Sequence, residues 1–143
     1  MKVICKENRA HKLSYEENEF TFSKETKFIA VLGKEYIVMG IMMRKDSNAL
    51  YYLIDEYHSP YWIPYIVFDI FDNQIFTDWH IAILEKAKST GTIFYISGFK
   101  ELCNDDDYHD ALMEREPWAL DIYFKRKREM QEWYELKPFM SKE

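Results

Sequence analysis

Glycine, proline and cysteine are all scarce in this 143-residue chain, and their scarcity excludes several kinds of protein. With only four glycines and four prolines, the chain has no low-complexity linker that would divide it into domains. The two cysteines, Cys5 and Cys103, are too few for the disulfide framework of a small secreted domain, so we expect reduced thiols. No apolar run approaches the ~20 residues that cross a bilayer, and the N-terminus lacks a signal-peptide core. We therefore expect a cytoplasmic protein without a membrane partner.

Motifs that would specify a reaction are also missing. The chain has no G-x-G-x-x-G, no P-loop and no serine in a G-x-S-x-G turn. On a helix, Asp106, His109 and Asp110 would share one face. Zinc, however, needs further converging ligands, and the calcium loop of an EF-hand needs a turn glycine that is missing here. A solvated helix start, whose acids complement the helix dipole, is favoured over a metal site. We predict no enzyme, no metal and no cofactor.

Acidic residues are concentrated in the middle of the chain. The net charge is -6, but residues 55–121 carry 14 acids and 4 bases, a charge of -10, while residues 1–54 and 122–143 each carry +2. Such a negative field repels the phosphates of nucleic acids and attracts a basic macromolecule. We therefore predict a basic protein partner. The one basic cluster, Lys125 to Arg128, is interpreted as a solvated helix face rather than as a nucleic-acid site.

Hydrophobic periodicity predicts strands over residues 1–103 and helices over 104–143, within one domain. Val3 and Cys5 share one face of a short first strand. Residues 36–43 are apolar on both faces, and we expect a hairpin over 35–55 with its turn at 45–48. Residues 77–88 fit strand or helix, with strand favoured, and 90–102 fit a strand.

The helical part begins after Asn104. Asp105 to Asp107 suit the first turn of one helix, and Pro117 opens a second helix at its first turn. The fold class is therefore α+β, with a curved antiparallel sheet, of which an SH3-like barrel is one form, followed by C-terminal helices.

Rings and acids alternate in residues 55–73, "DEYHSPYWIPYIVFDIFDN". Pro60 and Pro64 favour a stiff connection that tucks Trp62 over the end of a sheet, while exposed aromatics beside acids would anchor a partner. The predicted partner-binding residues are Asp55, Glu56, Tyr57, Trp62, Asp69, Asp72, Asp78, Trp79, Asp105, Asp106, Asp107, Tyr108 and Asp110.

Two other functions stay open. Asp55, Glu56 and His58 could serve an acid–base hydrolase if the fold gathers them in a cleft. The chain could instead be a regulatory interaction protein that dimerises through Trp118 and Trp133, although a monomer is favoured.

Several segments resemble small bacterial immunity proteins of contact-dependent and polymorphic toxin systems. They are "MKVICKENRA", "LGKEYIVMGI", "YYLIDE", "YWIPYIVFDIFDNQ", "TDWHI" and "GFKEL". The resemblance covers residues 1–122, and the basic tail departs from it. It implies a cytosolic protein that binds and neutralises a cognate toxin domain, such as a basic nuclease. It assigns no functional residues.

Overall fold

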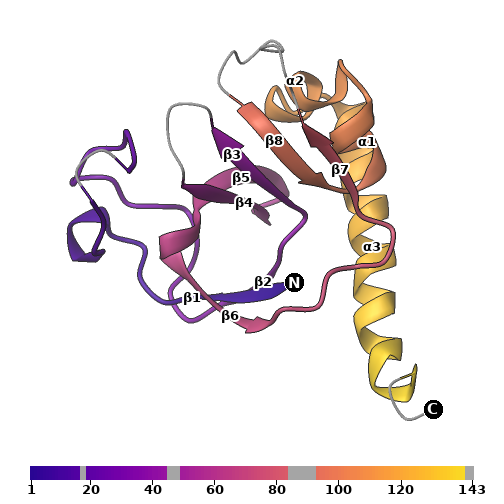
Figure 1. Cartoon of the computed structure of the whole chain (residues 1–143), viewed down its shortest axis with the longest axis horizontal. Coiled ribbons are helices and arrows are strands. Elements are labelled where there is room, and N and C mark those ends of the chain that lie inside the picture. Colours follow the sequence, from indigo (N-terminus) through magenta and orange to yellow (C-terminus); the bar gives the residue numbers. More distant parts are fainter. Residues whose placement is uncertain (17–18, 45–48, 84–92, 141–143) are drawn as a thin grey trace.

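The chain folds into two antiparallel sheets and three α-helices within the residues that the structure, a computed structural model, describes: 1–16, 19–44, 49–83 and 93–140 (Figure 1). The small sheet has the strand order β2–β1–β6, formed by Glu35–Ile37, Lys2–Cys5 and Phe68–Asp72. The large sheet has the order β5–β4–β3–β8–β7, formed by Ser59–Pro64, Leu50–Glu56, Gly40–Arg44, Ile93–Gly98 and His80–Ile83. Short 3-10 turns lie at Ala10–Lys12 and Tyr65–Val67. The predicted α+β class is confirmed.

The helices follow the last strand of the large sheet. They are α1, Lys100–Asn104; α2, Tyr108–Met113; and α3, Pro117–Met140, which runs along one side of the molecule (Figure 1). Pro117 occupies the first position of α3, where its missing N–H is not needed by the helix. The predicted strand over 90–102 was too long, because the chain is already helical from Lys100.

The central strands β3 and β4 of the large sheet are buried on both faces because each face packs against a different layer. Met42 and Leu53 face a core that includes Leu112 and Tyr123 of the helices. Ile41 and Ile54 face a second core shared with the small sheet. The prediction that residues 36–43 have two apolar, buried sides is therefore confirmed at Ile41 and Met42.

The apolar run around Val38 and Met39 passes from one sheet to the other. Val38 N–H donates to the Met1 carbonyl at 3.0 Å in the small sheet, and Met39 N–H donates to the Leu53 carbonyl at 2.8 Å in the large sheet. The predicted hairpin holds for β3 and β4, but β2 belongs to a separate sheet. The SH3-like barrel, one form that the sequence left open, is not adopted, because this crossing leaves two open sheets. The predicted turn at 45–48 lies outside the described residues.

Two further segments qualify the sequence predictions. Pro60 and Pro64 lie in β5, an edge strand paired with β4, rather than in a connection between strands. An edge strand tolerates proline because one side of its backbone needs no ladder partner. The favoured strand within 77–88 is confirmed for His80–Ile83, and residues 84–88 lie outside the described residues.

Paired glycines allow α1 to lie close to the large sheet. Gly40 of β3 stands opposite Gly98 of β8. A Cβ on Gly40 would lie 2.6 Å from Leu102 Cδ2, and a Cβ on Gly98 would lie 2.7 Å from the Met39 carbonyl oxygen. Gly98 also has a φ of +153°, a conformation that L-residues rarely adopt.

Replacing Gly98 by alanine should lower the free energy of unfolding by about 3 kcal/mol, since the new methyl group meets rigid backbone as well as an unfavourable φ. Gly33→Ala is the matched control: its φ is +79°, but open space surrounds the added Cβ. The control should lose only about 1 kcal/mol. Urea denaturation of both variants measures the difference, and equal losses would contradict close packing at Gly98.

Candidate partner-binding site

Folding neutralises part of the acidic segment with bases from both ends of the chain. Its ion pairs with lysine and arginine include Asp55 with Lys127 at 2.8 Å, Glu56 with Lys34 at 2.8 Å, Asp69 with Lys6 at 3.6 Å, and Glu101 with Arg126 at 2.6 Å. All four bases lie outside residues 55–121. The acidic residues of the segment therefore do not form one continuous surface.

The basic cluster of α3 is divided between the interior and solvent. Arg126 binds both carboxylate oxygens of Glu101, at 2.8 and 2.6 Å, and also contacts Glu129. This bidentate bond lowers the pKa of Glu101 below its ordinary value although burial opposes the shift. Lys125 and Arg128 are exposed. The predicted solvated face is therefore right for those two residues and wrong for Arg126 and Lys127.

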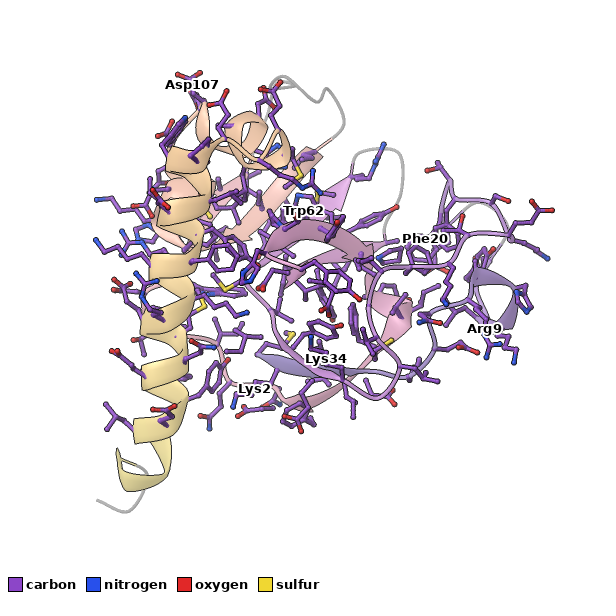
Figure 2. All side chains as sticks on the ribbon, turned by 180° about the vertical axis from the view of Figure 1, so that it is seen from behind. Lys2, Arg9, Phe20, Lys34, Trp62 and Asp107 are labelled. Carbon is purple, nitrogen blue, oxygen red and sulfur yellow. The ribbon has the colours of Figure 1, made fainter. Side chains whose placement is uncertain are left out.

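Six carboxylates gather where α1, α2 and α3 meet, and we call this group the acidic cap. They are Asp105, Asp106, Asp107, Asp110, Glu114 and Glu116. With Arg115 the cap carries a formal charge of -5. Figure 2 shows Asp107 at the end of the molecule where α3 begins, well away from Lys2 and Lys34. None of the four cations paired above lies in the cap, so those ion pairs leave its charge unchanged.

The cap is held rigidly by buried contacts. Tyr108 is fully buried, and its hydroxyl donates to the Ala119 carbonyl at 2.7 Å. The indole N–H of Trp62 donates to His109 Nε2 at 3.0 Å and joins α2 to β5. Tyr108 was therefore wrong as a partner contact, because its ring belongs to the core that supports the cap.

Trp118 provides an aromatic surface beside these acids. Its side chain is 44% exposed, its ring meets the edge of the Tyr108 ring at 5.8 Å, and its indole N–H donates to Glu116 at 2.6 Å. Sequence analysis considered Trp118 only for a dimer with Trp133. Trp133 instead packs on Phe76 at 5.7 Å and is partly buried. Trp118 lies near the acids because of the turn between α2 and α3, and no sequence motif predicts this turn.

The remaining predicted residues lie apart from the cap. Asp69 and Asp72 belong to β6, in the small sheet. Asp78 is exposed just before β7. Trp79 is partly buried against both cores, and its indole N–H is buried without a hydrogen-bond partner among the described residues. Trp62 contacts α2 through its hydrogen bond to His109. The predicted partner-binding residues therefore do not all belong to the acidic cap.

Asp55, Glu56, Tyr57 and His58 meet at a polar groove of about 610 Å³ between the small sheet and α3. Asp55 faces the helix, where it accepts hydrogen bonds from the Tyr123 hydroxyl at 3.0 Å and from Lys127. Glu56 points the other way and accepts from Lys34 and from the Tyr36 hydroxyl.

The partners of Glu56 decide its charge. Burial opposes its ionisation, but the bonds from Lys34 and Tyr36 outweigh burial and lower its pKa. The groove thus contains an ionised Glu56 whose oxygens, like those of Asp55, already have hydrogen-bond partners.

A strained turn lies at one end of the groove. Tyr57 and His58 connect β4 to β5 with φ values of 51° and 60°, where asparagine and glycine are preferred. Tyr57 is 77% exposed, so its ring adds no packing that would compensate for the strain. Its backbone N–H instead bonds the Glu56 carboxylate. Strain of this kind concentrates at functional sites.

Replacing the turn by Tyr57→Asn with His58→Gly should raise the free energy of unfolding by about 1–2 kcal/mol, because both new residues adopt positive φ at less cost. Thermal and urea unfolding measure the gain. Tyr57→Ala with His58→Ala, which keeps two residues that disfavour positive φ, should show no such gain. Destabilisation of the Asn-Gly variant would mean that the native side chains are needed for the fold.

His109 should make stability depend on pH. Burial lowers its pKa below the ordinary 6.5, against a smaller opposing effect of Asp110. The folded state therefore prefers the neutral ring, which accepts the bond from Trp62. Since the unfolded chain binds the proton first, stability should decrease as the pH falls below about 6.5, until the folded pKa is passed. Unfolding midpoints across this range should decrease less in His109→Gln, and identical profiles would refute the assignment.

Comparison with family models, with curated proteins and with solved structures finds no match to this chain. Across the described residues, no three His, Cys, Asp or Glu side chains are grouped so that they could hold a metal ion. The described helices also include none that is both long and apolar enough to span a membrane. Both cysteines are free and buried, and burial raises the pKa of each thiol to about 11. The acidic cap with Trp118 and the polar groove are the two candidate sites.

Proposed function

We propose that this protein binds and neutralises a basic partner protein, as an immunity protein neutralises a toxin domain. The observation that carries the proposal is the acidic cap with the exposed ring of Trp118. Elsewhere in the acidic segment, Asp55, Glu56, Asp69 and Glu101 are each paired with an internal base. The six carboxylates and the Arg115 side chain of the cap sum to a formal charge of -5.

The cap combines long-range attraction with a fixed contact surface. Clustered carboxylates accelerate the encounter with a cationic surface, and this effect weakens as salt increases. Trp118 offers a large ring that is already ordered on Tyr108, so binding loses little side-chain entropy there. The hydrogen bond from Trp62 to His109 holds α2 against the large sheet. A rigid, charged surface of this kind suits occlusion of a basic active site without any reaction.

A hydrolase is the second candidate, because the groove gathers Asp55, Glu56 and His58. The pairing of the two carboxylates speaks against it. A general acid needs a raised pKa and a general base needs a free lone pair near the substrate. Glu56, with a lowered pKa and bonds from Lys34 and Tyr36, suits neither role. Loss of a hydrolytic activity in Glu56→Gln would favour this candidate.

Neutralising Asp105, Asp106 and Asp107 as asparagines should slow association with a cognate basic toxin domain about tenfold at low salt. Trp118→Ala should accelerate dissociation about tenfold, because it removes an aromatic ring that the partner would bury on binding. Surface plasmon resonance over a salt series separates the two effects, and protection of cells that express the toxin tests the biological outcome.

The matched control is Glu16→Gln with Glu25→Gln and Glu132→Gln, which removes the same charge from exposed positions outside the cap. This control should change association less than the cap variant. Equal effects of the two sets would show that net charge, and not the cap, guides binding. Unchanged affinity in both the cap variant and Trp118→Ala would refute the proposed surface.

A further inference from the structure

The polar groove has a free strand edge as one wall and a helix as the other. β2 is an outer strand of the small sheet, and no described strand pairs with its other side. Glu35 and Ile37 of β2 line the groove together with Lys127, Gln131 and Glu135 of α3. The end of β4 forms the floor. In Figure 2, Lys2 lies on the sheet side beside the lower half of α3, and Lys34 lies further from the helix.

The backbone of β2 points unused hydrogen-bonding groups away from β1. Cys5 N–H donates to the Lys34 carbonyl, and Val38 N–H donates to the Met1 carbonyl. Because these directions alternate along an antiparallel strand, the N–H groups of Tyr36 and Val38 face β1, whereas those of Glu35 and Ile37 face away. Each of these two residues offers one N–H and one C=O to an added strand.

The side chains around the groove favour a polar occupant with both signs of charge. Lys2, Lys34 and Lys127 line it, and so do Glu35, Asp55, Glu56 and Glu135. The Lys34 side chain remains 49% exposed although it binds Glu56, so it can also meet an acidic group. The exposed Tyr57 ring lies at the strained end of the groove. This near balance of charge distinguishes the groove from the acidic cap.

We propose that the groove binds an extended polar segment of a partner protein, which pairs with β2 as a fourth strand and lies along α3. Strand addition obtains affinity from main-chain hydrogen bonds and specificity from neighbouring side chains. A groove of about 610 Å³ is within the range of ligand sites in proteins. The proposal uses a different surface from the acidic cap and holds whether or not the cap binds a basic protein.

The test selects binders for the full chain from a phage-displayed library of random linear peptides and measures the affinity of the selected peptides by fluorescence anisotropy. Glu35→Pro removes one N–H that faces the groove and none that faces β1, so the small sheet should remain folded. It should weaken peptide binding about tenfold or more. Glu35→Ala, which keeps the N–H, is the matched control and should bind nearly as well as the native chain.

Hydrogen exchange gives a second readout, since bound peptide should slow exchange at the Glu35 and Ile37 amides. Gln131→Trp places a large side chain of α3 in the groove and leaves β2 unchanged. If Glu35→Pro does not fold, the peptide affinity of Gln131→Trp decides the outcome. The cap variant with Asp105, Asp106 and Asp107 as asparagines should bind the peptides normally. Failure to enrich any peptide, or peptides that bind Glu35→Pro and Gln131→Trp as well as the native chain, would overturn the proposal.

Discussion

The arrangement of both candidate sites depends on how α3 is held against the large sheet. Tyr123 is fully buried, and its ring meets the edge of Phe99 at a centroid distance of 6.0 Å. Its hydroxyl and the ammonium of Lys127 bind the two oxygens of Asp55. Arg126 of α3 pairs with Glu101 of α1. Apolar burial supplies most of the energy, and the paired charges set the rotation of the helix, since a buried carboxylate without its partner would be costly.

This seating of α3 also explains the distribution of charge. Two cations of α3 neutralise carboxylates of the sheet and of α1, and Lys34 neutralises Glu56. The basic residues of α3 begin at Lys125, further along the helix than the acids around α2. Like charges repel in the cap, but the N-termini of α2 and α3 lie among them, and their dipoles favour negative charge. The folded protein thus tolerates the concentrated negative charge of the cap.

Unlike the cap, the groove is lined by both cationic and anionic side chains. Asp55 and Glu56 are bonded by lysines and tyrosines, and Glu56 also bonds the N–H of Tyr57. That bond helps to hold two residues at positive φ, so a charged network supports a strained turn. The same network fixes the floor below the free edge of β2. The cap offers charge to a partner surface, whereas the groove offers main-chain hydrogen bonds to a partner strand.

Local pattern was sufficient for much of the fold. Alternation at Val3 and Cys5, and Pro117 at the start of α3, reflect constraints that act within a few residues, so the sequence by itself determined strands, helices and the α+β class. The separation of β2 from β3 was decided only in the tertiary structure, because Val38 and Met39 bond different sheets. The two candidate sites depended on the tertiary structure even more than the fold did. Whether a carboxylate is free or paired is set by residues distant in the chain, such as Lys127 for Asp55, and sequence spacing carries no record of such contacts.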